Sequence, residues 1–208
     1  MVDPAHIAAM TNALEVLTAR IADCKICAAS FAETETAHQP RPVVRPSTTA
    51  RVMIAGQAPG ARVHQSGIPF DDPSGDRLRD WLGVDRDTFY DTARIAIVPM
   101  AFCFPGYDAR GSDLPPPKIC AQQWRADLLA AMGQVELTLL VGQYAQAWHM
   151  GRARKGSLTE TVRHWQDYGP HLLPLPHPSW RNTGWLKRNP WFAEDVLPWL
   201  KSEIARLV

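Results

Sequence analysis

Two segments of this chain carry side chains suited to binding a planar ring and to stabilising a leaving anion. The segment GIPF at 67–70 places Phe70 in a proline-bracketed loop, where an aromatic ring either stacks on a ligand or fills the core. The segment HPSWRN at 177–182 contains His177, which can donate a hydrogen bond to negative charge developing on a leaving group. A purely structural histidine is the alternative. Together the two segments favour an enzyme site that binds a planar base.

A glycine-rich turn at 56–60 could present backbone groups to such a ring. Its residues are Gly56, Gln57, Ala58, Pro59 and Gly60. The two glycines permit close backbone approach to a ligand, and the proline stiffens the loop. Neither GxGxxG nor the GK[ST] ending of a phosphate-binding loop is present. An ordinary strand-to-helix turn is the alternative reading.

Polar residues near these segments could hold water or nucleic acid. Asp71 and Asp72 could position a water molecule, and at least one of them is expected to cap the helix that follows. Four residues after His177 suit phosphate contacts and base stacking: Ser179, Trp180, Arg181 and Asn182. Basic residues with interleaved tryptophans suit single-stranded or locally opened nucleic acid. The alternative is an exposed basic turn.

Four cysteines form the third candidate site. They are Cys24, Cys27, Cys103 and Cys120, beginning with a Cys-x-x-Cys pair. Such a set could hold zinc or a [4Fe–4S] cluster, and its spacing does not choose between them. Buried thiols without a metal are the remaining alternative. A zinc enzyme built on the histidines lacks support, because no HExxH or comparable spacing occurs.

Apolar runs and helical periodicity indicate the elements that must position these residues. Short buried strands are predicted at 52–55, 95–100, 137–141 and 172–175, and helices at 5–23, 75–83, 119–132, 143–150 and 191–207. This alternation predicts an α/β fold with a mainly parallel sheet covered by helices on both faces. Ligands of such sheets bind beyond the carboxyl ends of the strands, which is where the candidate loops lie.

Composition limits the class of protein. The chain has 208 residues and a net charge of +1, so its total charge gives no general attraction to nucleic acid. No segment approaches the roughly 20 apolar residues of a membrane span. The N-terminus lacks the pattern of a secretory signal, which predicts a cytoplasmic location without membrane association. Four cysteines in a reducing compartment favour metal ligands or free thiols over disulfides.

Taken together, the motifs resemble the uracil-DNA glycosylase superfamily, most closely its iron–sulfur branch, often called family 4. The resemblance runs from about Cys24 to the C-terminus. The motif GE(A/G)PG of that branch is similar to GQAPG at 56–60, and TGxPF to SGIPF at 66–70. The segment KCRPP…KIC is similar to AFCFPG at 101–106 with KIC at 118–120, and the HP motif matches 177–178. The four cysteines coincide with the cluster ligands of the branch.

The resemblance implies a three-layer α/β/α domain with a central four-stranded, mainly parallel sheet. A single domain is expected over residues 1–208, with a helix, the Cys-x-x-Cys pair and a crossing loop in 1–50. The implied activity is that of a monofunctional DNA glycosylase. It would hydrolyse the N-glycosidic bond of uracil or a related deaminated base in base excision repair. A monomer acting on damaged DNA is expected, with a [4Fe–4S] cluster on the cysteines and zinc as the less favoured cofactor.

Base flipping gives each motif a role in this resemblance. The flipped base would stack on Phe70, Gln57 and Ala58 would bond its carbonyl oxygens through the backbone, and His177 would stabilise the departing anion. The expected base-binding set is Phe70, Gly56, Pro59, Gly60 and Gln143.

Two departures from the family pattern affect catalysis and base choice. Ala58 stands where the most efficient branch has a water-activating Asp, so Asp71, Asp72 or His64 are the candidate substitutes. Losing general-base help costs ~10²–10⁴ in rate, which predicts weak activity. Pro99 stands where the iron–sulfur branch has a base-reading Asn; Gln57, Gln143 or Asn182 would have to replace it.

A glycosylase-like protein that binds damaged or abasic DNA with little or no turnover is the alternative function. Covalent capture of an abasic sugar by His64 is a variant of it.

Overall fold

Four parallel strands form the centre of the structure, and each coincides with a mainly apolar run of the sequence. They are β1 (Val52–Ala55), β2 (Ile95–Ile97), β3 (Leu137–Val141) and β4 (Leu172–Leu175), in the spatial order β2-β1-β3-β4. The computed structural model describes residues 4–208, with side chains from residue 10 onward. The first three residues of the expected domain lie outside the described residues. β1, β2 and β3 are buried throughout, as is usual for parallel strands covered on both faces.

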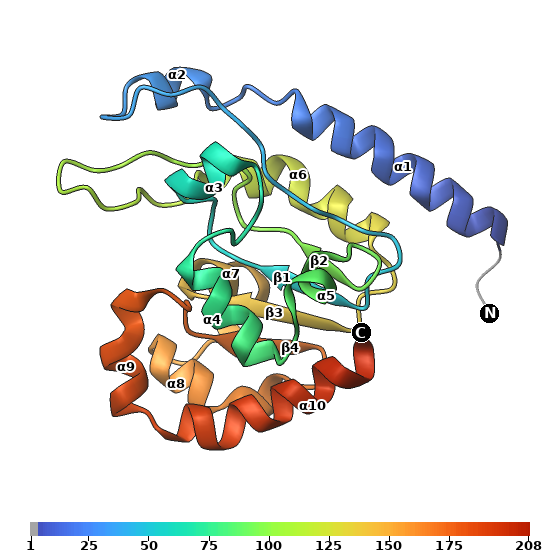
Figure 1. Cartoon of the computed structure of the whole chain (residues 1–208). Helices are drawn as coiled ribbons and strands as arrows, with labels where there is room; N and C mark the ends of the chain where they lie inside the picture. Colours follow the sequence, from blue (N-terminus) through green and yellow to red (C-terminus); the bar gives the residue numbers. More distant parts are fainter. Residues whose placement is uncertain (1–3) are drawn as a thin grey trace.

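Helices cover both faces of this sheet. Ile54 faces a core that contains Leu78 and Leu200, whereas its neighbour Met53 faces a separate core with Leu17 and Leu128. The first core is covered by α4 (Pro73–Leu82) and α10 (Leu197–Leu207), the second by α1 (Pro4–Ala22) and α6 (Lys118–Ala131). Figure 1 shows α1 and α6 on one side of the strands and α10 on the other. The structure therefore confirms the three-layer α/β/α fold.

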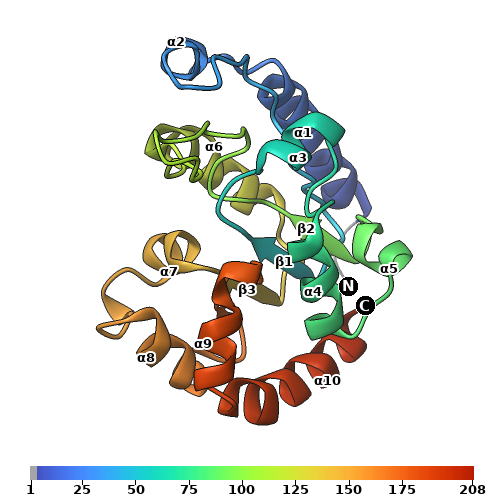
Figure 2. The same ribbon diagram turned by 60° about the vertical axis from the view of Figure 1, so that its left-hand side comes forward.

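Shorter helices complete the two layers. They are α2 (Ala28–Ala32), α3 (Ala61–Ser66), α5 (Arg86–Tyr90), α7 (Gln143–Met150), α8 (Leu158–Arg163) and α9 (Thr183–Arg188). Single turns at Gly151–Ala153, Trp165–Tyr168 and Trp180–Asn182 join them. α7 lies on the α6 side of the molecule (Figure 2), and Ala121 of α6 packs in one cluster with Ala145 of α7. None of the helices in residues 4–208 combines the length and apolar character that crossing a bilayer requires.

Two elements differ from their expected extents. β2 ends at Ile97 rather than at residue 100, although Val98 and Met100 still donate to the Ile54 and Gly56 carbonyls of the β1 segment. The expected helix at 191–207 is divided into a π-helical segment, Phe192–Val196, and α10. Pro198, within the first two positions of α10, lacks the N–H that an uninterrupted helix would use.

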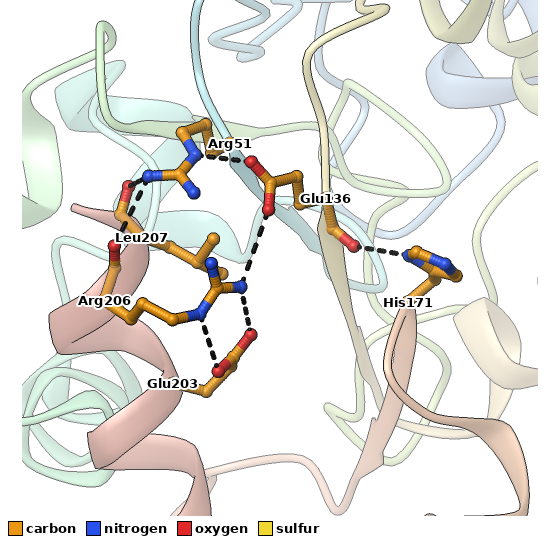
Figure 3. A network of polar contacts seen from close by, with 6 residues as sticks. All are labelled: Arg51, Glu136, His171, Glu203, Arg206 and Leu207. Carbon is orange, nitrogen blue, oxygen red and sulfur yellow. Dashed lines mark hydrogen bonds and ion pairs between the residues drawn. The ribbon is translucent and has the colours of Figure 1, made fainter.

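The two edges of the sheet have different roles. At the amino-terminal edge, Glu136 pairs with Arg51 at 2.6 Å and with Arg206 at 3.5 Å, and Arg206 also binds Glu203. This network fastens the end of α10 beside β1 and β3 (Figure 3). Since all strands are parallel, the loops after 55, 97, 141 and 175 leave from the other edge.

Candidate active site

A cavity of about 620 Å³ lies where the strands end. Its walls come from the 56–63 turn, from Phe70 and Asp72, from Pro99, from the 105–113 loop and from 177–182. The loop between β2 and α6 extends beyond the sheet on this side (Figure 1). A volume of this size falls in the range of small-molecule and cofactor sites. The Phe70 ring and the His177 imidazole, which are 107 positions apart by number, thus line one space.

Phe70 is held in an unusual backbone conformation. Its φ is +56°, a region that non-glycine residues rarely adopt and that clusters at functional sites. The Tyr90 hydroxyl donates to the Pro69 carbonyl at 2.9 Å, and the Phe70 carbonyl packs directly on Gly75 of α4. A Cβ on Gly56 would lie 3.3 Å from the Phe70 Cζ, so the ring lies against the glycine turn. The ring is therefore fixed beside the backbone of the 56–60 turn.

The glycine turn keeps donors available for a ligand. The Gly56 and Gln57 carbonyls accept hydrogen bonds from Met100 and Ala101, which continues the β1–β2 pairing past the strands. Among the described residues, no backbone carbonyl accepts a hydrogen bond from the N–H of Gln57 or Ala58. Both residues line the cavity. Two backbone donors are thus free to bind an acceptor placed beside the Phe70 ring.

His177 is neutral and has one defined acceptor nitrogen. Its Nδ1 accepts the Ser179 N–H at 3.2 Å, so in the neutral ring the proton belongs on Nε2. Burial lowers the pKa of His177, although the charge of Asp72 acts in the opposite direction. The Asn182 amide donates to the His177 carbonyl at 2.8 Å and fixes the loop. His177 can therefore donate from Nε2 to an oxygen or nitrogen that gains negative charge.

The loop that carries His177 is fastened to α4 by an arginine. Arg77 donates to the Ser179 carbonyl at 3.0 Å and to the Thr183 hydroxyl at 3.3 Å. All four residues expected to bind DNA, Ser179, Trp180, Arg181 and Asn182, line the cavity. The Trp180 side chain is 72% exposed, which leaves a large aromatic surface at the rim of a polar loop. This arrangement suits contact with a strand running past the cavity.

Two carboxylates line the cavity. Asp72 caps α4 by accepting the Gly75 N–H at 3.0 Å, as expected for one of the two aspartates. Asp113 comes from the 105–113 loop, and no ion pair to it occurs within residues 4–208. Partial desolvation raises the pKa of Asp113, Arg181 opposes the rise, and Asp72 adds to it. Either carboxylate could orient a water molecule in the cavity.

Three expected site residues lie outside the cavity lining. Asp71 forms an ion pair with Arg86 at 2.9 Å. His64 packs against the His38 ring at a centroid distance of 5.1 Å, and burial lowers its pKa. Gln143 starts α7 with its side chain exposed, because the chain turns into a helix immediately after β3. Their expected roles in water activation or base reading thus lack support from their positions.

Sequence reasoning missed Arg77 and Asp113. Arg77 belongs to α4, and its partners are more than 100 residues away in the chain, so no local pattern reveals the contact. Asp113 follows the turn-forming sequence GYDARG in a loop at the carboxyl edge of the sheet. Its position in a loop at this edge, where ligands of parallel sheets bind, could have marked Asp113 as a candidate site residue.

The four cysteines surround a second, much smaller cavity of about 20 Å³. Cys24, Cys27, Cys103 and Cys120 all line it, together with apolar residues that include Phe31 and Trp124. Burial raises the pKa of Cys103 to about 12 and that of Cys120 to about 11, and charges on neighbouring cysteines add to both shifts. No group of three or more His, Cys, Asp or Glu side chains in residues 4–208 converges closely enough to hold a metal ion.

The chemistry of this donor set nevertheless fits a cluster of several metal atoms. Four thiols from three separate segments face one apolar space, and the Phe102 N–H donates to the Cys120 sulfur at 3.4 Å. Such N–H···S bonds and apolar surroundings are the features that stabilise thiolate-ligated clusters. In the absence of a metal, the raised pKa values would keep the Cys103 and Cys120 thiols protonated at neutral pH.

Comparison with known families agrees with this geometry. The family model described as the Uracil DNA glycosylase superfamily matches residues 43–201. The match spans all four strands, the glycine turn, Phe70 and the His177 loop. It covers more than half of the chain, and the protein therefore belongs to the uracil-DNA glycosylase superfamily.

Proposed function

We propose that this protein is a DNA glycosylase that hydrolyses the N-glycosidic bond of uracil or a related deaminated base. One observation carries the proposal: a single cavity brings together the Phe70 ring, the free N–H groups of Gln57 and Ala58, and the Nε2 of His177. A flipped base needs a stacking surface, donors for its carbonyl oxygens and a donor for the anion that departs. The superfamily match supports the same reaction class.

Base choice rests on backbone donors in this proposal. Pro99 lines the cavity but has no N–H, and its carbonyl already accepts from Arg125 at 3.1 Å. The Asn182 amide nitrogen is bonded to the His177 carbonyl. The N–H groups of Gln57 and Ala58 would donate hydrogen bonds to a carbonyl oxygen of the base, as in uracil, hypoxanthine or xanthine. The exocyclic amino group of cytosine or adenine is itself a hydrogen-bond donor, so it would face these N–H groups without forming a hydrogen bond.

Water activation falls to Asp72 or Asp113 in this proposal. Asp72 already uses one oxygen to cap α4, whereas within residues 4–208 no ion pair engages the Asp113 carboxylate, and its pKa is raised. Replacing the functional carboxylate by Asn should lower the base-release rate by ~10²–10⁴ and leave DNA affinity unchanged. Comparison of Asp113→Asn with Asp72→Asn identifies which one acts.

Proposed base release is tested with a panel of oligonucleotides. Each carries one uracil, hypoxanthine or xanthine, single-stranded or paired, and alkali then cleaves the abasic sites. We expect cleavage at the deaminated base and none at cytosine or adenine. Tight binding of these oligonucleotides without base release would instead identify a protein that binds damaged DNA. A protein–DNA complex that survives denaturing electrophoresis would identify covalent capture of the abasic sugar.

A matched pair of histidine variants tests the role of the leaving-group donor. His177→Asn should lower the rate by about 10²–10³, the usual effect of removing one preorganised donor. His171→Asn is the control, because His171 bonds the Glu136 carbonyl at the opposite edge of the sheet (Figure 3). Equal rates for the two variants would remove His177 from the mechanism.

A further inference from the structure

Arg125 is a fully buried cation in the middle of the protein. Its side chain belongs to α6, and the residue is only 1% exposed. The guanidinium donates to the Val98 and Pro99 carbonyls at 3.1 Å each. It also donates to Nε2 of His149 on α7, from Nε at 3.0 Å and from Nη2 at 2.7 Å. All of its hydrogen-bond acceptors are therefore carbonyls or an imidazole.

None of these partners carries negative charge. His149 is neutral, since burial and the nearby Arg125 charge lower its pKa to about 3. Within residues 4–208, no carboxylate lies at ion-pair distance from Arg125. Burial lowers the pKa of Arg125 to about 10, which still leaves it charged at neutral pH. A buried charge without an opposite charge is strongly unfavourable, so an anion is needed nearby.

The four-cysteine site lies close to this guanidinium, because Arg125 and Cys120 both hydrogen-bond to the short 98–102 segment. Cys120 lies five residues before Arg125 on the same helix. The charges of the two residues act on each other: each shifts the pKa of the other toward its charged form. Cys120 shares its cavity with Cys24, Cys27 and Cys103. A [4Fe–4S] core held by four thiolates carries net negative charge, which would supply the missing counter-charge.

We propose that Arg125 is the buried counter-charge of the four-cysteine site and that it sets the reduction potential of the cluster held there. The inference includes the proposal that the four cysteines hold a [4Fe–4S] cluster, as expected from the sequence, and it is independent of base excision. Reduction adds negative charge to the cluster, so a fixed positive charge nearby stabilises the reduced form and raises the potential. The carbonyls of Val98 and Pro99 hold the guanidinium in position for this role.

The test is the midpoint potential of the cluster in the full chain, reconstituted anaerobically with iron and sulfide. Arg125→Gln removes the charge and keeps an N–H donor for the carbonyls, whereas Arg125→Lys keeps the charge. The control is Arg79→Gln, since Arg79 is also buried but pairs with Asp76 and packs on Phe89 in the opposite core. We expect a more negative potential for Arg125→Gln only.

Two results would overturn the inference. One is a wild-type potential in an Arg125→Gln protein with full iron and sulfide content. The other is an equal shift in the Gln and Lys variants, which would make hydrogen bonding rather than charge responsible. If the Gln variant does not load iron, Arg125→Lys decides. A potential close to wild type supports the counter-charge, and a strongly negative one refutes it.

The cofactor and the activity can fail separately in this experiment. A wild-type chain that binds no iron and sulfide after reconstitution overturns both the cluster proposal and the role of Arg125. Base release is measured on the same samples. A protein without a cluster that still releases uracil would leave the glycosylase proposal standing.

Discussion

Gly75→Ala should impair base release by moving Phe70, although residue 75 itself lies outside the cavity lining. An added Cβ would lie 1.8 Å from the Phe70 carbonyl oxygen and 2.9 Å from the Phe70 Cβ. Real Cβ atoms essentially never approach closer than 3.0 Å, so the first turn of α4 and the Phe70 backbone must separate by more than 1 Å. A misplacement of about 1 Å can cost about 10²-fold in rate.

The Phe70 loop cannot follow this movement without losing other contacts. Tyr90 holds the Pro69 carbonyl, and the φ of +56° at Phe70 persists only because the surroundings impose it. We therefore expect a roughly 10²-fold lower single-turnover rate of uracil release. Overpacking costs about 1–3 kcal/mol of stability, so the fold should survive. Thermal unfolding and circular dichroism check that it does.

Gly156→Ala is the matched control for this experiment. Gly156 has no neighbouring heavy atom within 4 Å of the added Cβ, and it lies in the segment between α7 and α8. The Gly156→Ala protein should release uracil at the wild-type rate. A Gly75→Ala protein that is folded and as fast as wild type would refute the claim that the position of Phe70 controls catalysis.

Three further predictions concern the surroundings of the two cavities. The pKa of His149 is about 3 in the folded chain and 6.5 ordinarily, so the unfolded chain binds the proton first. Stability should therefore fall by up to about 1.4 kcal/mol per pH unit between pH 6.5 and 3, and His149→Gln should flatten this dependence in urea unfolding. Arg77→Met removes the bonds to Ser179 and Thr183 and should weaken DNA binding about tenfold, measured by fluorescence anisotropy. Cys103→Ser should lower both iron content and melting temperature; unchanged iron would exclude this residue as a ligand.

The sheet was predictable because its strands are marked by composition. β1 is a continuous apolar run and β3 is apolar except for Thr138, and burial on both faces favours such runs. The short helices α3 and α5 were not predicted, because five or six residues are too few to show a helical period. The start of α5 depends instead on Asp85, which accepts the Thr88 N–H at 2.8 Å.

The site was predictable to the extent that it follows from topology. Parallel strands bring their carboxyl-terminal loops to one edge, so Phe70 and His177 could be expected to face the same space. Gln143 shows the limit of that rule. It follows β3 directly but starts a helix, and its side chain is exposed. Contacts such as Arg77 with Ser179 depend on how α4 packs against a distant loop.

The buried polar side chains were the part of the structure that the sequence predicted least well. Arg125 sits in a helix whose sequence has ordinary periodicity, and nothing adjacent to it marks a buried charge. Its partners Val98, Pro99 and His149 come from two other elements. Long-range packing, rather than local pattern, decides that Arg125 is buried.

Quantifying the free base released under single-turnover conditions tests the central claim most directly. Wild-type protein in excess over uracil-containing DNA should release uracil and leave an abasic site, and Phe70→Ala should release it far more slowly. The absence of any released uracil, hypoxanthine or xanthine from folded wild-type protein would contradict the assignment of this cavity as a base-excision site.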